Sequence, residues 1–325
     1  MAKRSTQHYC GIGGQAVLEG VMMKHRNMYA VAVRRPDQEV EVEVDEYHGI
    51  LEDTVWVKIP FIRGVFVFLD SLILGMRALN LSASYYEDEN EKPTAADKVA
   101  DEVTGGRGEK ILAAVTVVIS FALAIGLFVV LPYWISTLLG RFIRSASLLA
   151  IVEGAVRILI FLIYIVAITA MKDIRRLYMY HGAEHKCINC LESGDELTVE
   201  NVRRASRFHK RCGSSFIVFV VLVSVVLFFF IRVDNPLLRI LLRIALIPVI
   251  AGISYELIRL AGRSSNPVIE LLSLPGLWTQ RLTTKEPDDQ MIEVGIASVE
   301  AIYDWKSYLR EEFPEYYEEE EDWDA

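Results

Sequence analysis

Long apolar runs without charged side chains dominate the middle of the chain. Residues 111–139 contain no charged side chain, and a helix needs about 20 apolar residues to cross a bilayer. The run 213–231 is also uncharged and is too long for a buried strand. Two further apolar stretches, 148–171 and 237–260, are interrupted by a few charges but are long enough to cross. The pattern predicts a mostly α-helical polytopic membrane bundle with about four transmembrane helices.

A fifth apolar stretch, residues 59–81, carries a polar stripe. Arg63, Asp70 and Arg77 recur every seven residues along it, so they share one face of a helix. The stretch is followed by a polar, glycine-containing linker at 82–110. This pattern favours a helix that lies in the membrane interface or re-enters the membrane, rather than a span.

The chain opens with a small β element. Apolar and polar residues alternate in 29–35 and 39–44, on either side of a turn around Pro36, which is typical of a half-buried hairpin. Residues 1–58 are therefore expected to hold a glycine-rich segment and then a β-hairpin. The glycine-rich segment, 11–20, lacks the lysine of a phosphate-binding loop and follows no expected strand, so a phosphate site is not favoured.

The C-terminal part, residues 261–310, is expected to form cytoplasmic helical segments. Its apolar periodicity runs to about Leu309, and Thr284 or Asp288 is placed to cap the final helix. Residues 311–325 hold nine carboxylates and neither lysine nor arginine. We expect this tail to be disordered, because like charges repel and little apolar surface remains.

Composition supports a protein that is partly solvated by lipid. The 325 residues have a mean hydropathy of +0.29. There are 43 acidic and 34 basic side chains, and the nine carboxylates of the tail account for the whole net charge of −9. Nucleic-acid binding needs a basic face, so this balance argues against a nucleic-acid partner. Four cysteines are too few for a disulfide scaffold, and no secretory signal peptide is evident.

The distribution of lysine and arginine predicts the orientation in the membrane. Nine of these residues lie in the connection 172–212, whereas the other connections between the expected spans hold one or two. Basic residues are enriched in cytoplasmic loops. The connection 172–212 and both termini are therefore expected in the cytoplasm.

Charges inside two of the expected spans are spaced for pairing. Glu153 and Arg157 are four residues apart, and so are Arg239 and Arg243, so each pair projects from one helix face. Ionisable groups within a membrane usually pair with one another or mark a transport path. Structural ion pairing between the second and fourth spans is the simpler interpretation, and a substrate or ion path is the alternative.

The connection 172–212 carries the strongest candidate for chemistry. His181 and His185 are four residues apart, so on a helix both can reach one metal ion. Glu184 completes an H-x-x-E-H pattern and is placed to act as a base for water. Three of the six histidines and three of the four cysteines lie within residues 181–212. This concentration favours a metal site over a chance histidine pair.

Several other side chains are candidates for completing the metal site. His209 and Cys212 lie just before the third expected span, and the chain can return them to the histidine pair. Glu192 falls on the same helical side as the histidines and is an additional candidate ligand. Cys187 and Cys190 fall on the opposite side, so they remain candidates only for a separate redox or zinc half-site.

Seven short motifs are distinctive in this sequence, at residues 14–23, 180–186, 197–201, 207–213, 255–259, 275–278 and 282–287. Through these motifs the chain resembles the YqhQ-like family of bacterial membrane proteins, over residues 11–309. This resemblance implies a bacterial inner-membrane protein of a family of unknown function whose members are predicted to be metal-dependent enzymes. It implies no particular reaction.

The sequence therefore predicts a metal-dependent enzyme of the bacterial inner membrane. His181, His185 and either His209 or Cys212 are expected to hold a divalent metal, with Zn²⁺ as the first expectation, and Glu184 is expected to be the general base. The reaction would be metal-assisted hydrolysis at the cytoplasmic face.

Two other classes of function are weighed against this one. A non-enzymatic membrane scaffold or regulator would use the metal only to hold the loop, and closed four-ligand coordination would favour it. A transporter is ranked last because the sequence lacks the broken-helix pairs typical of transporter repeats. The lipid bilayer is the expected partner. The substrate is not readable from the sequence, and a protein partner or a homo-oligomer stays open.

Overall fold

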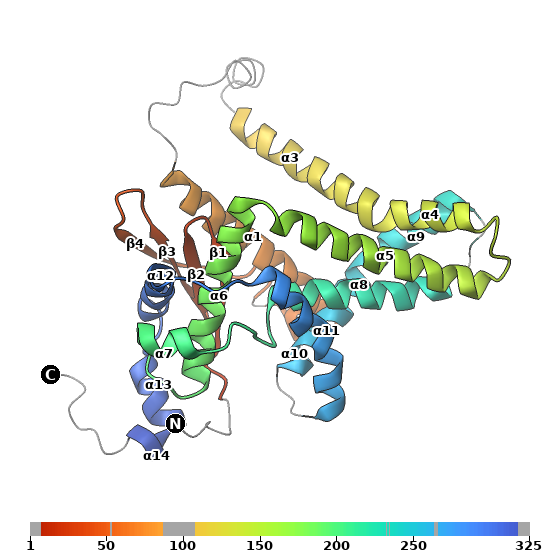
Figure 1. The fold of residues 1–325 in the computed structure, drawn as a ribbon. Coiled ribbons are helices and arrows are strands. Elements are labelled where there is room, and N and C mark those ends of the chain that lie inside the picture. Colours follow the sequence, from red (N-terminus) through yellow and green to blue (C-terminus); the bar gives the residue numbers. More distant parts are fainter. Residues whose placement is uncertain are drawn as a thin grey trace. The chain divides into compact units, whose positions relative to one another are not determined.

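The computed structural model is mostly helical, with one small antiparallel sheet near the N-terminus (Figure 1). It describes residues 8–52, 54–86, 108–231, 233, 235–262 and 266–317. The chain forms two compact units. Unit 1 comprises residues 1–86, 166–219 and 251–325, and unit 2 comprises residues 87–165 and 220–250.

The sheet of unit 1 has four strands that pair in sequence order. They are β1 (Ile12–Val17), β2 (Gly20–His25), β3 (Met28–Arg34) and β4 (Val40–Glu46). The expected hairpin is confirmed as β3 and β4, in which Arg34 pairs with Val40. The glycine-rich segment was not expected to be a strand, but it forms β1. The turn from β1 to β2 contains Glu19, whose φ of 49° is left-handed.

Helices cover both faces of this sheet. Met23 belongs to a core formed with α6 (Lys172–Glu192) and α12 (Asp289–Glu300), whereas its neighbour Met22 packs on the side of α1 (Ile62–Ser84). A strand buried on both faces has no alternation of apolar and polar residues. This explains why the pattern of hydrophobic positions did not reveal β2.

The polar stripe of α1 faces other parts of unit 1. Arg63 forms an ion pair with Glu256 at 2.5 Å, and Asp70 accepts a hydrogen bond from the Tyr47 hydroxyl at 3.1 Å. The Arg77 guanidinium lies 5.3 Å from the centre of the Tyr47 ring. Each charged side chain of the stripe thus has a charged, polar or aromatic partner within unit 1.

Within the described residues, four stretches of helix are long and apolar enough to cross a membrane. The expected spans 111–139, 148–171 and 213–231 fall on three of them, and α1 is the fourth, although the sequence pattern favoured an interfacial or re-entrant helix there. The stretches are α1, Val115–Leu139, α5 (Ala146–Thr169) and α8 (Gly213–Phe230). Val115–Leu139 is made up of most of α3 (Gly108–Ile125), the π-helical turn η2 (Gly126–Val130) and α4 (Leu131–Leu139).

The fourth expected span, 237–260, is not one straight helix. It is divided into α9 (Pro236–Ala245) and α10 (Ile247–Ala261), which are bent by 40°. The break has a local cause in Pro248, which has no N–H to donate and whose ring crowds the carbonyl of Ile244. The expectation of a continuous helix is therefore corrected.

The buried charges of unit 2 form one cluster. Arg157 donates to Glu153 at 3.0 Å, and Arg243 donates to the other carboxylate oxygen of Glu153 at 2.9 Å. All three side chains are buried. Arg239 does not join them, and its guanidinium donates instead to the Val233 carbonyl at 2.8 Å. The pairing therefore joins α5 to α9 through Arg243.

The remaining helices of unit 1 follow the expected caps only in part. Asp288 accepts a hydrogen bond from the Met291 N–H at 2.9 Å and so caps α12, whereas the Thr284 hydroxyl donates to Gln280. The expected single helix to Leu309 is two helices, because the chain breaks after α12. The other elements are η1 (Val55–Lys58), α7 (Val199–Arg204), α11 (Pro267–Thr283), α13 (Trp305–Glu312) and α14 (Pro314–Tyr317).

The beginning of the acidic tail is folded, contrary to the expectation of disorder. Phe313 and Tyr317 are buried, and the Tyr317 hydroxyl donates to the Gly194 carbonyl at 2.8 Å. These aromatic side chains supply apolar area that a count of the surrounding carboxylates does not reveal. Residues 318–325 lie outside the described residues, as do residues 87–107 of the expected polar linker.

Candidate metal centre

The H-x-x-E-H motif lies in the buried half of α6, not in a surface loop. The helix ends near Gly194, whose left-handed φ of 76° is common just beyond a helix C-terminus. A Cβ atom on Gly182 would overlap the Lys285 carbonyl, so only glycine allows the backbone at Lys285 to come this close to α6. A Cβ atom on Gly14 would lie 2.7 Å from Glu184 Cγ. The β1 strand therefore packs directly on the glutamate of the motif.

Three candidate ligands converge in unit 1. One donor atom from each of His181, His185 and Cys212 lies within 4.8 Å of the others. His181 Nε2 is 3.1 Å from the Cys212 sulfur. His185 and Cys212 are buried, and His181 is partly buried. Two histidines of α6 thus lie close to Cys212, the residue immediately before α8.

The far side of each imidazole is fixed by a backbone carbonyl. His181 Nδ1 lies 2.9 Å from the Thr283 oxygen, and His185 Nδ1 lies 2.6 Å from the Arg207 oxygen. A carbonyl only accepts, so each Nδ1 must carry the hydrogen, and in a neutral imidazole the lone pair is then on Nε2. His185 Nε2 is buried and makes no hydrogen bond within the described part of the chain. Both Nε2 atoms are directed towards the space that the donors share.

The donors are electrostatically coupled. Burial alone would raise the pKa of Cys212, but His181 and His185 hold it well below its ordinary value. Burial alone would lower the pKa of His181, but the Cys212 thiolate and Glu184 raise it to about 10. Without a bound cation, the site therefore holds a thiolate beside an imidazolium.

These residues fit a metal ion that prefers nitrogen and sulfur ligands. Two imidazoles and one thiolate form a donor set suited to Zn²⁺, and a hydrogen bond from Nδ1 to a carbonyl is the usual support of a metal-binding histidine. Hard cations such as Mg²⁺ and Ca²⁺ prefer oxygen ligands, so they suit this set less well. Glu184 Oε2 lies 3.8 Å from His181 Nε2 and 3.9 Å from His185 Nε2, beside the three donors.

His209 and Glu192 do not join the group of three donors, although the centre of the His209 ring lies 5.7 Å from that of His185. The two form a second buried group, in which His209 Nε2 is 3.4 Å from Glu192 and Arg211 pairs with the same carboxylate. Glu192 faces the same side of α6 as His185, but seven residues of helix separate them by about 10 Å along the axis. The sequence argument considered the angle around the helix axis but not the rise along it.

The remaining cysteines of α6 lie away from the site. Cys187 is buried against α12, where its sulfur would be 2.9 Å from a Cβ atom on Gly295, and burial raises its pKa well above the ordinary value. Cys190 is also buried, and its thiol donates to the Glu196 carbonyl at 3.3 Å. Neither joins a group of three ligand-type side chains in the described ranges.

Comparison with known proteins identifies the family. Residues 59–305 match the profile of a family described as "Protein of unknown function (DUF1385)". The chain belongs to this family. The "Uncharacterized protein YqhQ" of Bacillus subtilis (strain 168) is 37% identical over 289 residues, which are 88% of this chain and 90% of the relative. No solved structure gives a significant match. The resemblance seen in the sequence is thus confirmed, and neither description specifies a reaction.

Several residues of the candidate site were not identified as functional from the sequence. Thr283 and Arg207 act through their backbone carbonyls, which no side-chain pattern reveals, and Gly14 acts by having no side chain. A signal for them did exist. All three positions lie in motifs that carry the family resemblance, and the structure gathers those motifs around His181 and His185.

Replacing Glu192 with glutamine is expected to lower stability while leaving metal affinity within about tenfold. Burial would raise the pKa of Glu192, but His209 and Arg211 outweigh it and lower the pKa from its ordinary value of 4.5. A carboxyl with a lowered pKa stabilises the fold at neutral pH, and this contribution is lost as the pH falls below 4.5 through the folded-state pKa. We expect a loss of about 1–3 kcal/mol at pH 7, measured by chemical unfolding.

The pH dependence provides the control for this prediction. Stability of the variant should fall less steeply than that of the parent between pH 5 and pH 3, because the titrating group has been removed. A large loss of metal with unchanged stability would show instead that Glu192 is a ligand.

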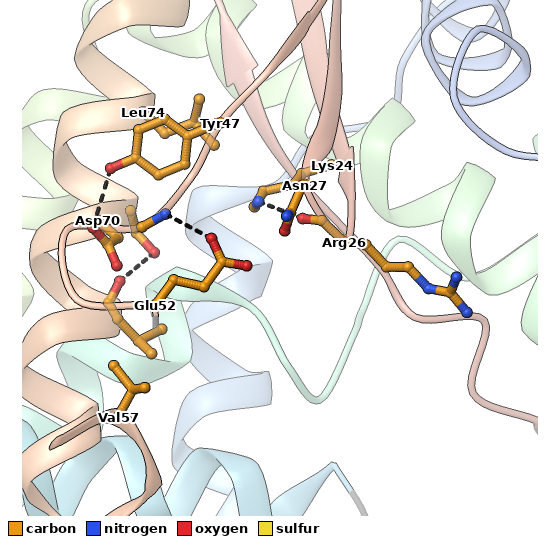
Figure 2. Close-up of a pocket in the computed structure, with 11 residues that line it drawn as sticks. Lys24, Arg26, Asn27, Tyr47, Glu52, Val57, Asp70 and Leu74 are labelled. Carbon is orange, nitrogen blue, oxygen red and sulfur yellow. Dashed lines mark hydrogen bonds between the residues drawn. The ribbon is translucent and has the colours of Figure 1, made fainter. Parts of the chain in front are cut away.

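A pocket of about 300 Å³ also lies in unit 1, separate from the three donors (Figure 2). It is formed by the β2–β3 turn, by Tyr47, Gly49, Glu52 and Val57, and by α1. Figure 2 shows Tyr47 directed at Asp70, and the Gly49 N–H donates to Glu52 at 3.2 Å. None of the residues expected from the sequence to bind metal lines this pocket.

Proposed function

We propose that this DUF1385 protein is a metal-dependent enzyme of the bacterial cytoplasmic membrane that performs metal-assisted hydrolysis at the cytoplasmic face. The observation that carries the proposal is the convergence of two Nε2 atoms and one thiolate, with both Nδ1 atoms held by carbonyls. A site used only for packing would not need two imidazoles oriented in this way, one buried and one partly buried.

Each residue has a defined role in this proposal. His181, His185 and Cys212 would hold one divalent cation, for which Zn²⁺ is the best match. A zinc ion in such a site supplies Lewis acidity, which makes water a nucleophile near neutral pH. Glu184 Oε2 lies beside both Nε2 atoms and would accept the proton that the attacking water loses. The Thr283 and Arg207 carbonyls keep the imidazoles in the required tautomer.

Membrane insertion is the second part of the proposal. The stretch Val115–Leu139 and the helices α1, α5 and α8 are long and apolar enough to cross, and the bent α9–α10 pair adds a fifth candidate. Only 6% of the most apolar part of Val115–Leu139 is buried within the protein, which suits contact with lipid. The nine basic residues of 172–212 would place the metal centre and both termini in the cytoplasm.

Zinc affinity is expected to depend on pH in a defined direction. Because the Cys212 thiolate raises the pKa of His181 to about 10, the metal-free site holds a proton that zinc must displace. Affinity should therefore fall about tenfold for each unit of pH below 10. Competition with a chelator of known affinity, measured from pH 6 to pH 9, tests this slope. Affinity that does not change over this range would contradict the imidazolium–thiolate pair.

A structural metal is the alternative, and one observation favours it. Glu184 is only 5% exposed and lies close to both histidines, so it could complete a closed set of four ligands. A closed set leaves no position for a substrate. The protein would then be a non-enzymatic membrane scaffold or regulator.

Replacement of Glu184 with glutamine separates the two functions. As a general base, Glu184 is expected to be needed for hydrolysis but not for metal, so the variant should keep its zinc and lose about 100-fold or more in rate. Zinc content is measured by mass spectrometry, and rate with chromogenic esters, phosphoesters and peptides. Glu315→Gln is the matched control, because Glu315 is an exposed residue of the same unit. Unchanged hydrolysis in Glu184→Gln would rule out the role as base, and loss of zinc would support the closed structural site.

A further inference from the structure

Helix α11 of unit 1 has its polar side buried and its apolar side exposed. Val268, Leu271, Leu274 and Trp278 are each more than half exposed. A helix on the surface of a water-soluble protein shows the opposite arrangement. The buried positions of α11 are small or polar: Ser273, Gly276, Thr279, Gln280 and Thr283.

The polar side of α11 is fixed by specific contacts with the beginning of α8 and with His209, which precedes it. The Gln280 amide donates to the Ser215 hydroxyl at 2.8 Å and to the His209 carbonyl at 2.8 Å, and it accepts from the His209 N–H at 2.9 Å. A Cβ atom on Gly276 would lie 2.7 Å from Ser215 Oγ. These contacts prevent the helix from turning its leucines inwards, so the exposed apolar side is a fixed feature.

The contact with Ser215 also indicates the depth of α11 in the bilayer. Helix α8 has 18 residues and is therefore about 27 Å long, which is close to the roughly 30 Å of hydrocarbon in a bilayer. If α8 crosses, all of it is needed, and Ser215, its third residue, lies at one border of the hydrocarbon. Gly276 touches Ser215, so the middle of α11 lies at the same border. Tryptophan is enriched at this level of membrane proteins, and Trp278 is exposed there.

The length and ends of α11 indicate how it meets the bilayer. It has 17 residues, with Glu270 near its beginning and Arg281 near its end, and it is not among the helices long and apolar enough to span in the described residues. A helix with one apolar side and charged ends lies in the plane of the interface.

We propose that α11 is an interfacial membrane helix that places its apolar side, Val268 to Trp278, in lipid and holds the metal centre with its other side. The Thr283 carbonyl, at the end of α11, fixes His181, so the site is positioned directly by a helix that rests on the bilayer. The proposal rests on the membrane insertion of α8 in the proposed function, and it adds a lipid-contacting element within the C-terminal part expected to be cytoplasmic.

A spin label at position 271 tests this contact in the full-length protein. The Leu271→Cys variant is labelled and reconstituted into vesicles of phosphatidylethanolamine and phosphatidylglycerol. Collisions of the label with oxygen, which concentrates in lipid, are compared with collisions with a water-soluble nickel chelate. The four natural cysteines are buried, and the unmodified protein measures any labelling of them. Leu274→Cys serves as a second variant if the first does not fold.

Two reference positions make the result interpretable. Val226→Cys reports on α8, where the side chain is 58% exposed, and Gln290→Cys reports on an exposed position of α12. The label at 271 is expected to resemble that at 226, with nickel accessibility severalfold lower than at 290 and oxygen accessibility higher.

The other outcomes would overturn the proposal in distinguishable ways. High nickel accessibility at 271 with lipid contact at 226 would mean that α11 faces water while the membrane assignment of α8 stands. Low accessibility to both reagents at 271 would mean that another protein or a second copy of this chain covers the helix. High nickel accessibility at 226 would remove the membrane insertion on which the proposal rests.

Discussion

Replacing Cys212 with serine is expected to lower zinc affinity by more than 100-fold. The Cys212 sulfur is one of only three converging donors in the described part of the chain, and it carries the negative charge of the set. A serine hydroxyl is not ionised at neutral pH, so two neutral imidazoles would remain. Loss of a residue that merely supports a ligand already costs about 10–100-fold in affinity, and loss of a ligand itself should cost more.

The chain provides matched controls for this variant. Cys187→Ser and Cys190→Ser make the same chemical change at buried positions outside the three donors. They should retain zinc, although burial of a hydroxyl can lower stability. Affinity is measured by competition with a chelator, and circular dichroism verifies folding. If all three serine variants lose zinc equally, the loss reports on folding and the assignment of Cys212 fails. If only Cys212→Ser keeps its zinc, the ligand set is wrong.

Replacing Glu153 with glutamine is expected to lower the free energy of unfolding by about 3–5 kcal/mol. The carboxylate is the shared partner of Arg157 and Arg243, and both arginine residues are 2% exposed. Without it, two buried positive charges repel each other with no adjacent anion. The midpoint of thermal unfolding in detergent should fall clearly below that of the parent.

Arg239→Gln is the control for this second prediction. Arg239 lies on the same helix as Arg243, but it contacts a backbone carbonyl and not Glu153. Its replacement should change stability by less than that of Glu153. A Glu153→Gln variant as stable as the parent would contradict a structural ion pair and would favour the alternative of a path for a substrate or an ion.

The fold could be predicted from the sequence where one physical effect acts alone. The helices α5 and α8 follow directly from long apolar runs, and the β3–β4 hairpin follows from alternation on both sides of Pro36. Prediction was incomplete where effects combine. The bend near Pro248 depends on a single missing N–H within an apolar run. The folded start of the tail depends on Phe313 and Tyr317, which the surrounding charge obscures.

The candidate site could be identified from the sequence only where local helix geometry determines it. The spacing of His181 and His185 fixes their common direction within one helix, so sequence alone could pair them. The choice between His209 and Cys212 depends on how the chain returns after α7, which no local pattern specifies. In the structure the return brings Cys212 to the pair and leaves His209 with Glu192. Side-chain identity indicated which residues are candidate ligands, and the tertiary structure determined which of them converge.

X-ray absorption spectroscopy of the zinc-loaded, full-length protein tests the central claim most directly. The first shell should contain one sulfur at about 2.3 Å and nitrogen at about 2.0–2.1 Å, and the sulfur contribution should disappear in Cys212→Ser but persist in Cys187→Ser. A shell of nitrogen and oxygen only, or a parent protein that takes up no zinc when purified without chelators, would contradict the account.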